Sequence, residues 1–248
     1  MRLELRPAEG WRAFAGEVGV IVLGVLIALA AQQAAESVNE RREAAGARAI
    51  VVGEIEESLT VLELRKSVQP CVDKRLRELR AIVDQWGRTG SFTTPRWVGQ
   101  APWFVNSSVR LEAAQSAGRL ALLPSEEQYR IGLITGTLRN FREIQAAEME
   151  AWAKLRMLQS GADALSASDR TAIRLALQEA SLLNYRARVA AGQAIPFAAS
   201  YGWHPNRRHL KVMLARSGKN GQFSPSICFS LDTPPEVANA NQSFPVAE

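Results

Sequence analysis

The chain is poor in the residues on which several protein classes depend. Its 248 residues include two cysteines, which excludes a disulfide-dense scaffold, while 17 glycines and 11 prolines exclude collagen. Only one apolar stretch is long enough to cross a bilayer, and this excludes a multi-span membrane protein. Apolar residues nevertheless make up 47% of the chain, so disorder throughout is excluded and one or two domains can bury a core.

Catalytic signatures are also missing. The sequence contains no Gly-x-Gly-x-x-Gly, phosphate-binding loop, Gly-x-Ser-x-Gly, Cys-x-x-Cys or His-Glu-x-x-His motif. The two histidines, His204 and His209, could form a metal site with Cys228 and Asp232 only if the tertiary fold happened to gather them. The sequence thus nominates no catalytic residue, cofactor or metal ligand, and it favours a non-enzymatic protein while leaving an enzyme open.

The apolar stretch reads VGVIVLGVLIALAA and ends at Ala31. Its length predicts a transmembrane helix over residues 13–35, after an N-terminal tail at 1–12. The residues that characterise the predicted membrane segment are Trp11, Glu17, Gly19, Gly24 and Leu29. A cleaved signal peptide with a site at 28–30 is the alternative, but the acidic residues of the long leading region favour an uncleaved anchor.

The orientation of this anchor is not decided by charge. The tail holds three arginines, and three more follow the span: Arg2, Arg6 and Arg12 before it, Arg41, Arg42 and Arg48 after it. Because a short basic tail before a large domain is typical of a signal anchor, we expect the N-terminus in the cytoplasm. In a bacterium the bulk would then be periplasmic, where Cys71 and Cys228 either pair or remain buried thiols.

Two stretches carry a family resemblance. They are Glu17-Val-Gly-Val-Ile-Val-Leu-Gly-Val-Leu-Ile-Ala-Leu29 followed by Asn39-Glu-Arg-Arg-Glu43, and Ser108-Val-Arg-Leu-Glu-Ala-Ala-Gln-Ser-Ala-Gly-Arg-Leu-Ala-Leu-Leu-Pro124. With these motifs the chain resembles a bacterial family of uncharacterised proteins that have one N-terminal membrane span and a helical domain. It departs from the family pattern directly after the span, where Trp and acidic residues are often found. The resemblance implies an uncleaved anchor and implies no activity.

Apolar residues recur at helical spacing between residues 36 and 69. Val38, Ala45, Val52 and Leu59 repeat every seven residues, with Ile55 and Leu62 between them, which is a coiled-coil-like pattern. Such a stripe either packs on the chain's own domain or forms a seam between copies. We favour packing within the domain and keep Val52, Ile55, Leu59 and Leu62 as candidate interaction residues.

Further helices are expected along the chain. One follows Pro70 with a single apolar face, another begins at Ser125 as its N-cap and continues to about 159, and a third begins at the Ser166 cap and continues to about 191. The loop at 87–100 and the residues after it are rich in aromatic residues, which either pin the loop to the core or form a patch for a partner. The candidates for that patch are Trp97, Trp103 and Phe104.

The positive charge lies in the last part of the chain. Residues 1–150 hold equal numbers of acidic and basic side chains, so residues 151–248 carry the whole net charge of +5. Arg207, Arg208 and Lys211 are the candidates for contact with an acidic protein, anionic lipid headgroups or nucleic acid. A periplasmic location disfavours nucleic acid.

Together these patterns predict an all-α protein: one transmembrane helix, a helical and partly coiled-coil-like extracytoplasmic domain at 36–218, and an extended or disordered tail at 219–248. We expect a non-enzymatic interaction protein, an accessory or scaffold subunit of a bacterial inner-membrane assembly. Its partners would be the bilayer and another membrane protein or a second copy of itself. The alternative is a tethered periplasmic domain that binds a ligand or catalyses a reaction.

Overall fold

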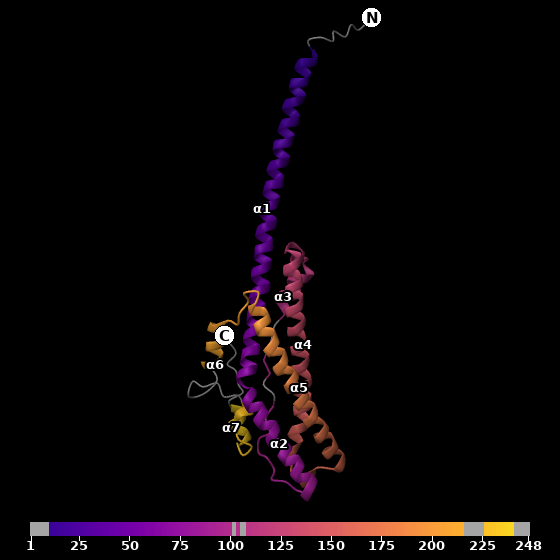
Figure 1. Cartoon of the computed structure of the whole chain (residues 1–248), viewed down its shortest axis with the longest axis vertical. Helices are drawn as coiled ribbons and strands as arrows, with labels where there is room; N and C mark the ends of the chain where they lie inside the picture. The colour runs from indigo at the N-terminus through magenta and orange to yellow at the C-terminus, as the bar shows by residue number, and fades with distance from the viewer. Residues whose placement is uncertain (1–9, 101–102, 105–107, 216–225, 241–248) are drawn as a thin grey trace.

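The computed structural model describes residues 10–100, 103–104, 108–215 and 226–240, and these residues form helices and no strand. A long helix, α1, extends far beyond a bundle made by the rest of the chain (Figure 1). The α-helices are α1 Gly10–Ser67, α2 Gln69–Thr89, α3 Val109–Ser116, α4 Ser125–Leu155, α5 Ala167–Ala199, α6 Arg207–Ala215 and α7 Pro235–Ala240. Four short 3-10 turns lie between them: η1 Arg119–Leu122, η2 Arg156–Ser160, η3 Ala162–Ala164 and η4 Ser226–Cys228. The predicted all-α class is confirmed.

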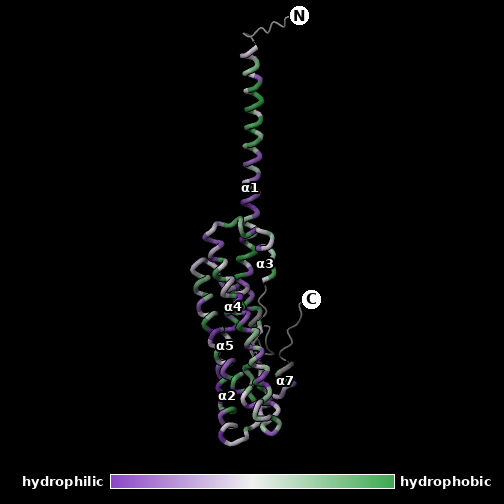
Figure 2. The backbone as a smooth tube through the Cα atoms, turned by 90° about the vertical axis from the view of Figure 1, so that its right-hand side faces the viewer, coloured by the Kyte–Doolittle hydropathy of each residue, from purple (hydrophilic) through white to green (hydrophobic). Residues whose placement is uncertain are grey.

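Helix α1 has two parts with different surroundings. Its first part is apolar and stands clear of the bundle, and Figure 2 shows the change to polar residues that follows. The first buried residue of α1 is Ala47, and from Val51 onward its apolar side belongs to the core. At about 1.5 Å per residue, positions 36–46 separate the apolar part from the bundle by roughly 16 Å of continuous helix.

The bundle core is made by α4 and α5 together with the second part of α1 and α2. Helices α4 and α5 run in opposite directions along the length of the bundle (Figure 1). Trp86 of α2, Phe141 and Trp152 of α4 are among its largest fully buried side chains. The apolar face predicted for α2 is confirmed, since all its members are buried: Val72, Leu76, Leu79, Val83 and Trp86.

Of the two predicted N-caps, the one of α5 is present and the one of α4 is not. Ser166 caps α5 as predicted, because its hydroxyl accepts a hydrogen bond from the Asp169 amide while the Asp169 carboxylate accepts one from the Ser166 amide. The predicted Ser125 cap of α4 is wrong. Pro124 occupies the N-cap position, where no side chain caps the helix. The side-chain amide of Gln128 donates instead to the Leu123 carbonyl at 2.7 Å.

The extended tail predicted for residues 219–248 is wrong for residues 226–240. This segment contains η4 and α7, and Ile227 and Ala238 are buried. A disulfide between Cys71 and Cys228 and a hydrogen bond from Arg75 of α2 to the Phe229 carbonyl hold it against the bundle. The predicted tail residues 219–225 and 241–248 lie outside the described residues.

Candidate functional site

The predicted membrane segment forms the free part of α1. In the described part of the chain, α1 is the one helix long and apolar enough to cross a membrane, and its apolar window is not buried against any other element. Trp11 stacks near Phe14, with 5.9 Å between ring centroids, at the end of the helix where an interfacial aromatic is expected. Gly19 and Gly24 face open space, so a Cβ at either position would meet no atom of this chain. Glu17 and Leu29 are likewise exposed.

The heptad pattern of α1 enters the bundle only in its second half: Val38 and Ala45 are exposed above the bundle. Ile55, Leu59 and Leu62 are fully buried in the core, and Val52 packs against its edge. Their apolar side faces α5, α3 and other elements of the same chain. The interpretation that we favoured, packing within the domain, agrees with this burial. Ile55, Leu59 and Leu62 offer no open surface in the single chain.

The aromatic residues after α2 take different positions. Trp97 and Phe104 are buried, and the Phe104 backbone exchanges hydrogen bonds with the Gln145 side chain of α4 at 3.3 Å in both directions. Trp103 is 45% exposed. The buried rings of Trp97 and Phe104 therefore hold this segment on the core. Trp103 is the member of this group that a partner could reach.

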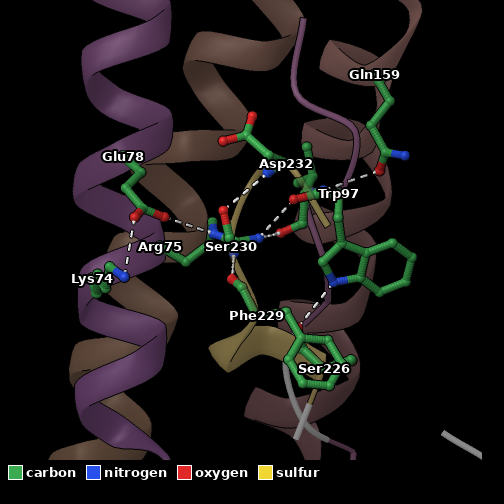
Figure 3. A network of polar contacts seen from close by, with 10 residues as sticks. Lys74, Arg75, Glu78, Trp97, Gln159, Ser226, Phe229, Ser230 and Asp232 are labelled. Carbon is green, nitrogen blue, oxygen red and sulfur yellow. Dashed lines mark hydrogen bonds and ion pairs between the residues drawn. The ribbon is translucent and has the colours of Figure 1, made fainter. Parts of the chain in front are cut away.

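A buried arginine joins three distant segments of the chain (Figure 3). Arg75 of α2 is 1% exposed, and its guanidinium donates hydrogen bonds to the carbonyls of Trp97, Val98 and Phe229. Its Nε also donates to Glu78 at 2.9 Å. Burial lowers the pKa of Arg75, and Glu78 opposes this effect. A single side chain thus joins α2, the aromatic loop and the C-terminal segment.

Further contacts reinforce this junction, which we call the Arg75 junction. The Trp97 indole donates to the Ser226 carbonyl, and the Trp97 amide donates to the Leu231 carbonyl, each at 2.9 Å. The Cys71–Cys228 disulfide lies one helical turn from Arg75 on α2. Gly99 has a positive φ of 81°, and a Cβ there would lie 3.2 Å from Ile227 and 3.5 Å from the Arg75 guanidinium. Spacing in the sequence gives no signal for this junction.

A second polar network crosses the middle of the core. Arg65 of α1, 1% exposed, pairs with fully buried Glu148 of α4 at 3.0 Å and donates to Asn184 of α5 at 2.8 Å. Asn184 in turn donates to Asp73 and accepts from Gln69. Burial raises the pKa of Glu148, and the charge of Arg65 partly opposes this shift. The network connects all four main helices through polar side chains rather than through apolar packing alone.

The basic residues of α6 lie on the surface of the bundle. Arg207, Arg208 and Lys211 are exposed, as are His204 and His209. Helix α6 lies beside α1 partway down the bundle, not at the end nearest the apolar segment (Figure 1). This position suits an acidic partner protein better than the headgroups of the membrane that α1 would cross. Among the described residues no cluster of three histidine, cysteine or acidic side chains could hold a metal ion.

No family model, curated protein or solved structure matches the chain. The resemblance to the bacterial family with one N-terminal span therefore stays a prediction. What the chain can do follows from its geometry: an exposed apolar helix, continuous with a bundle whose polar interior is engaged in holding helices together.

Proposed function

We propose that the protein is a membrane-anchored interaction protein, an accessory or scaffold subunit of a bacterial inner-membrane assembly. The observation that carries this proposal is the continuity of α1. One uninterrupted helix supplies both the apolar segment and a wall of the bundle core, so the bundle would be held at a fixed distance and angle from the membrane. A continuous helix of this kind suits a protein that holds an interaction surface of its bundle at a fixed position relative to the membrane.

The interior of the bundle supports a structural role for its polar groups. Arg75 and Arg65 are the most conspicuous buried charges, and each is engaged with groups of several helices or loops. Neither faces an open site. The exposed basic residues of α6 and the exposed Trp103 supply surface for a partner instead.

The disulfide supports a periplasmic position of the bundle. Cys71 and Cys228 are 157 residues apart and bonded, and such bonds persist in oxidising compartments but are rare in the cytoplasm. With the bundle in the periplasm, the short N-terminal tail lies in the cytoplasm. This orientation agrees with a signal anchor.

Topology and composition of the complex test the proposal together. A C-terminal alkaline phosphatase fusion should be active, and the chain should stay in the membrane fraction at alkaline pH. After detergent extraction, another polypeptide or a second copy should co-purify at a fixed stoichiometry. An inactive fusion would contradict the orientation. A lone monomer that carries a ligand would contradict the interaction role and favour the alternative, a tethered ligand-binding or catalytic domain.

A further inference from the structure

Helix α5 has two apolar sides of unequal size. The side turned to the core carries mainly small residues: Ala176, Ala180, Ala187, Ala191, Ala194 and Ala198. The side turned to solvent carries larger ones, with Leu175 60% exposed, Leu182 58% exposed and Tyr185 54% exposed. A helix that serves only its own bundle places its large apolar residues inside. Helix α5 buries Ile173, Leu177 and Leu183 in this way, but it also leaves three large residues on its solvent side.

The exposed large residues form a regular line, which we call the outer stripe. Leu175 and Leu182 are exposed and lie seven residues apart, and exposed Tyr185 lies three residues after Leu182. Half-buried Val189 continues the line seven residues after Leu182. Steps of seven are the spacing of the a positions of a pairing helix, and Tyr185 occupies one d position, while Gln178 and Gly192 occupy the other two. The stripe is bordered by α2, where Arg80 reaches Ser181, and by α4, where Asn140 reaches Arg186. It therefore lies along an open ridge between two helices of the bundle.

We propose that the outer stripe pairs with the same stripe of a second copy of this chain, in parallel. This inference rests on the proposed membrane anchor, because two copies held in one bilayer point the same way. Helix α5 extends along the bundle toward the end where the apolar segment leaves it (Figure 1), so the stripes of two upright copies can meet along their length. In a symmetric pair each residue of the stripe meets its own counterpart.

The charges beside the stripe fit this pairing. In a parallel pair a residue flanking the seam faces the residue five positions later on the partner. Arg174 would then face Glu179 of the other copy, Ser181 would face Arg186, and Arg188 would face Gln193. One contact is an attractive ion pair and none places like charges together. Within the described part of the chain, Arg174 and Glu179 form no ion pair of their own.

A seam made by one helix is narrow. From Leu175 to Val189 the stripe is about 21 Å long, and a one-helix seam is smaller than the interfaces of about 1,600 Å² that sustain stable soluble complexes. Confinement in a membrane raises the effective concentration of the second copy and compensates for the small area. We therefore expect a dimer that forms in membranes and weakens on dilution in detergent.

Cysteine cross-linking of the full chain in its native membrane tests the register. Leu182→Cys should give a cross-linked dimer on mild oxidation, because the two side chains meet at the symmetry axis. Val109→Cys on α3 is the matched control, since Val109 is 70% exposed and lies outside the stripe. It should give at least tenfold less dimer than Leu182→Cys. Equal cross-linking at both positions, or none at position 182, would overturn the proposal.

A second measurement separates pairing from folding. At a high chain concentration, where the unsubstituted chain stays dimeric in detergent, Leu182→Glu should give a monomer in light scattering while its helix content stays that of the unsubstituted chain. Val109→Glu should leave the dimer intact. A membrane-bound chain that is monomeric without substitution would overturn the stripe pairing and leave the anchor standing. A dimer that is soluble without detergent would instead overturn the anchor. Loss of a different co-purifying polypeptide in Leu182→Glu would identify the occupant as another protein and would overturn the second copy.

Discussion

At the scale of single residues, buried arginines decide how distant parts of the chain are joined. The Arg75 guanidinium holds three backbone carbonyls that belong to the loop after α2 and to the C-terminal segment. A guanidinium suits this role because its donors lie in a fixed plane and it keeps its charge. Without it, carbonyls at the Arg75 junction would be buried with fewer hydrogen bonds, which costs free energy.

Arg75→Met is therefore expected to lower the free energy of unfolding by at least about 1–3 kcal/mol, the cost of leaving a buried acceptor without its donor. Urea unfolding followed by circular dichroism measures the change. Arg77→Met provides the matched control, since Arg77 is exposed on the same helix and should change the free energy by less than about 0.5 kcal/mol. Equal losses in the two variants would show that the Arg75 junction adds no stability.

Glu148 makes the stability depend on pH in a defined direction. Because burial raises its pKa in the folded state, Glu148 binds a proton more tightly when the chain is folded. Its contribution to stability is then fully present below the unfolded pKa of about 4.3 and is lost as pH rises through the folded pKa.

Glu148→Gln removes this titration and keeps an oxygen that can accept from Arg65. The free energy of unfolding of the natural chain should therefore fall relative to that of Glu148→Gln as pH is raised from 4 to 8. Glu150→Gln, at an exposed position of α4, should follow the natural chain across the same range. Parallel curves for the natural chain and Glu148→Gln would contradict the raised pKa.

At the scale of elements, the neighbours of an apolar stripe, and not the spacing of its residues, decide whether the stripe is part of the core or an exposed surface. Helices α1 and α5 both carry apolar residues at steps of seven, but the α1 pattern is buried at Ile55, Leu59 and Leu62, whereas Leu175 and Leu182 of α5 are exposed. Spacing alone does not tell these cases apart, because both give the same pattern in the sequence. The two stripes are consequently expected to respond to charge in opposite ways.

Leu59→Asp should unfold the bundle, because it places a charge at a fully buried position where no partner is available. The far-ultraviolet circular dichroism signal and the melting transition report this loss. Val38→Asp is the control, since Val38 is exposed on α1 above the bundle and its change should leave the transition in place. If Leu59→Asp instead left a helical monomer and dissociated an oligomer, the α1 stripe would be a seam between chains.

At the scale of the whole molecule, the apolar segment and the bundle share a helix but no packing. Among the described residues, none buries the apolar window of α1, and the first fully buried residue of α1 is Ala47. The two parts should therefore be coupled in position and independent in stability. The apolar segment adds attachment, whereas the bundle owes its stability to its own core.

A chain that starts at residue 36 is accordingly expected to fold in aqueous buffer without detergent. Its melting temperature should lie within a few degrees of that of the full chain, because the removed residues bury no part of the core. A chain that starts at residue 56 is the comparison, since it lacks Val51 and Ile55 of the core and should melt much lower. If the first truncation were as unstable as the second, the free part of α1 would be supporting the bundle.

The sequence by itself determined the helical class, the apolar segment, the apolar face of α2 and the capped start of α5. Each of these depends on residues within a few turns of one another, so local spacing carries the signal. Tertiary structure decided the rest. Arg75 reaches Phe229 across 154 positions, Arg65 reaches Asn184 across 119, and the segment at 226–240 is folded because α2 holds it. Contacts at such separations leave no periodic trace in the chain, because their partners meet only after the helices have packed.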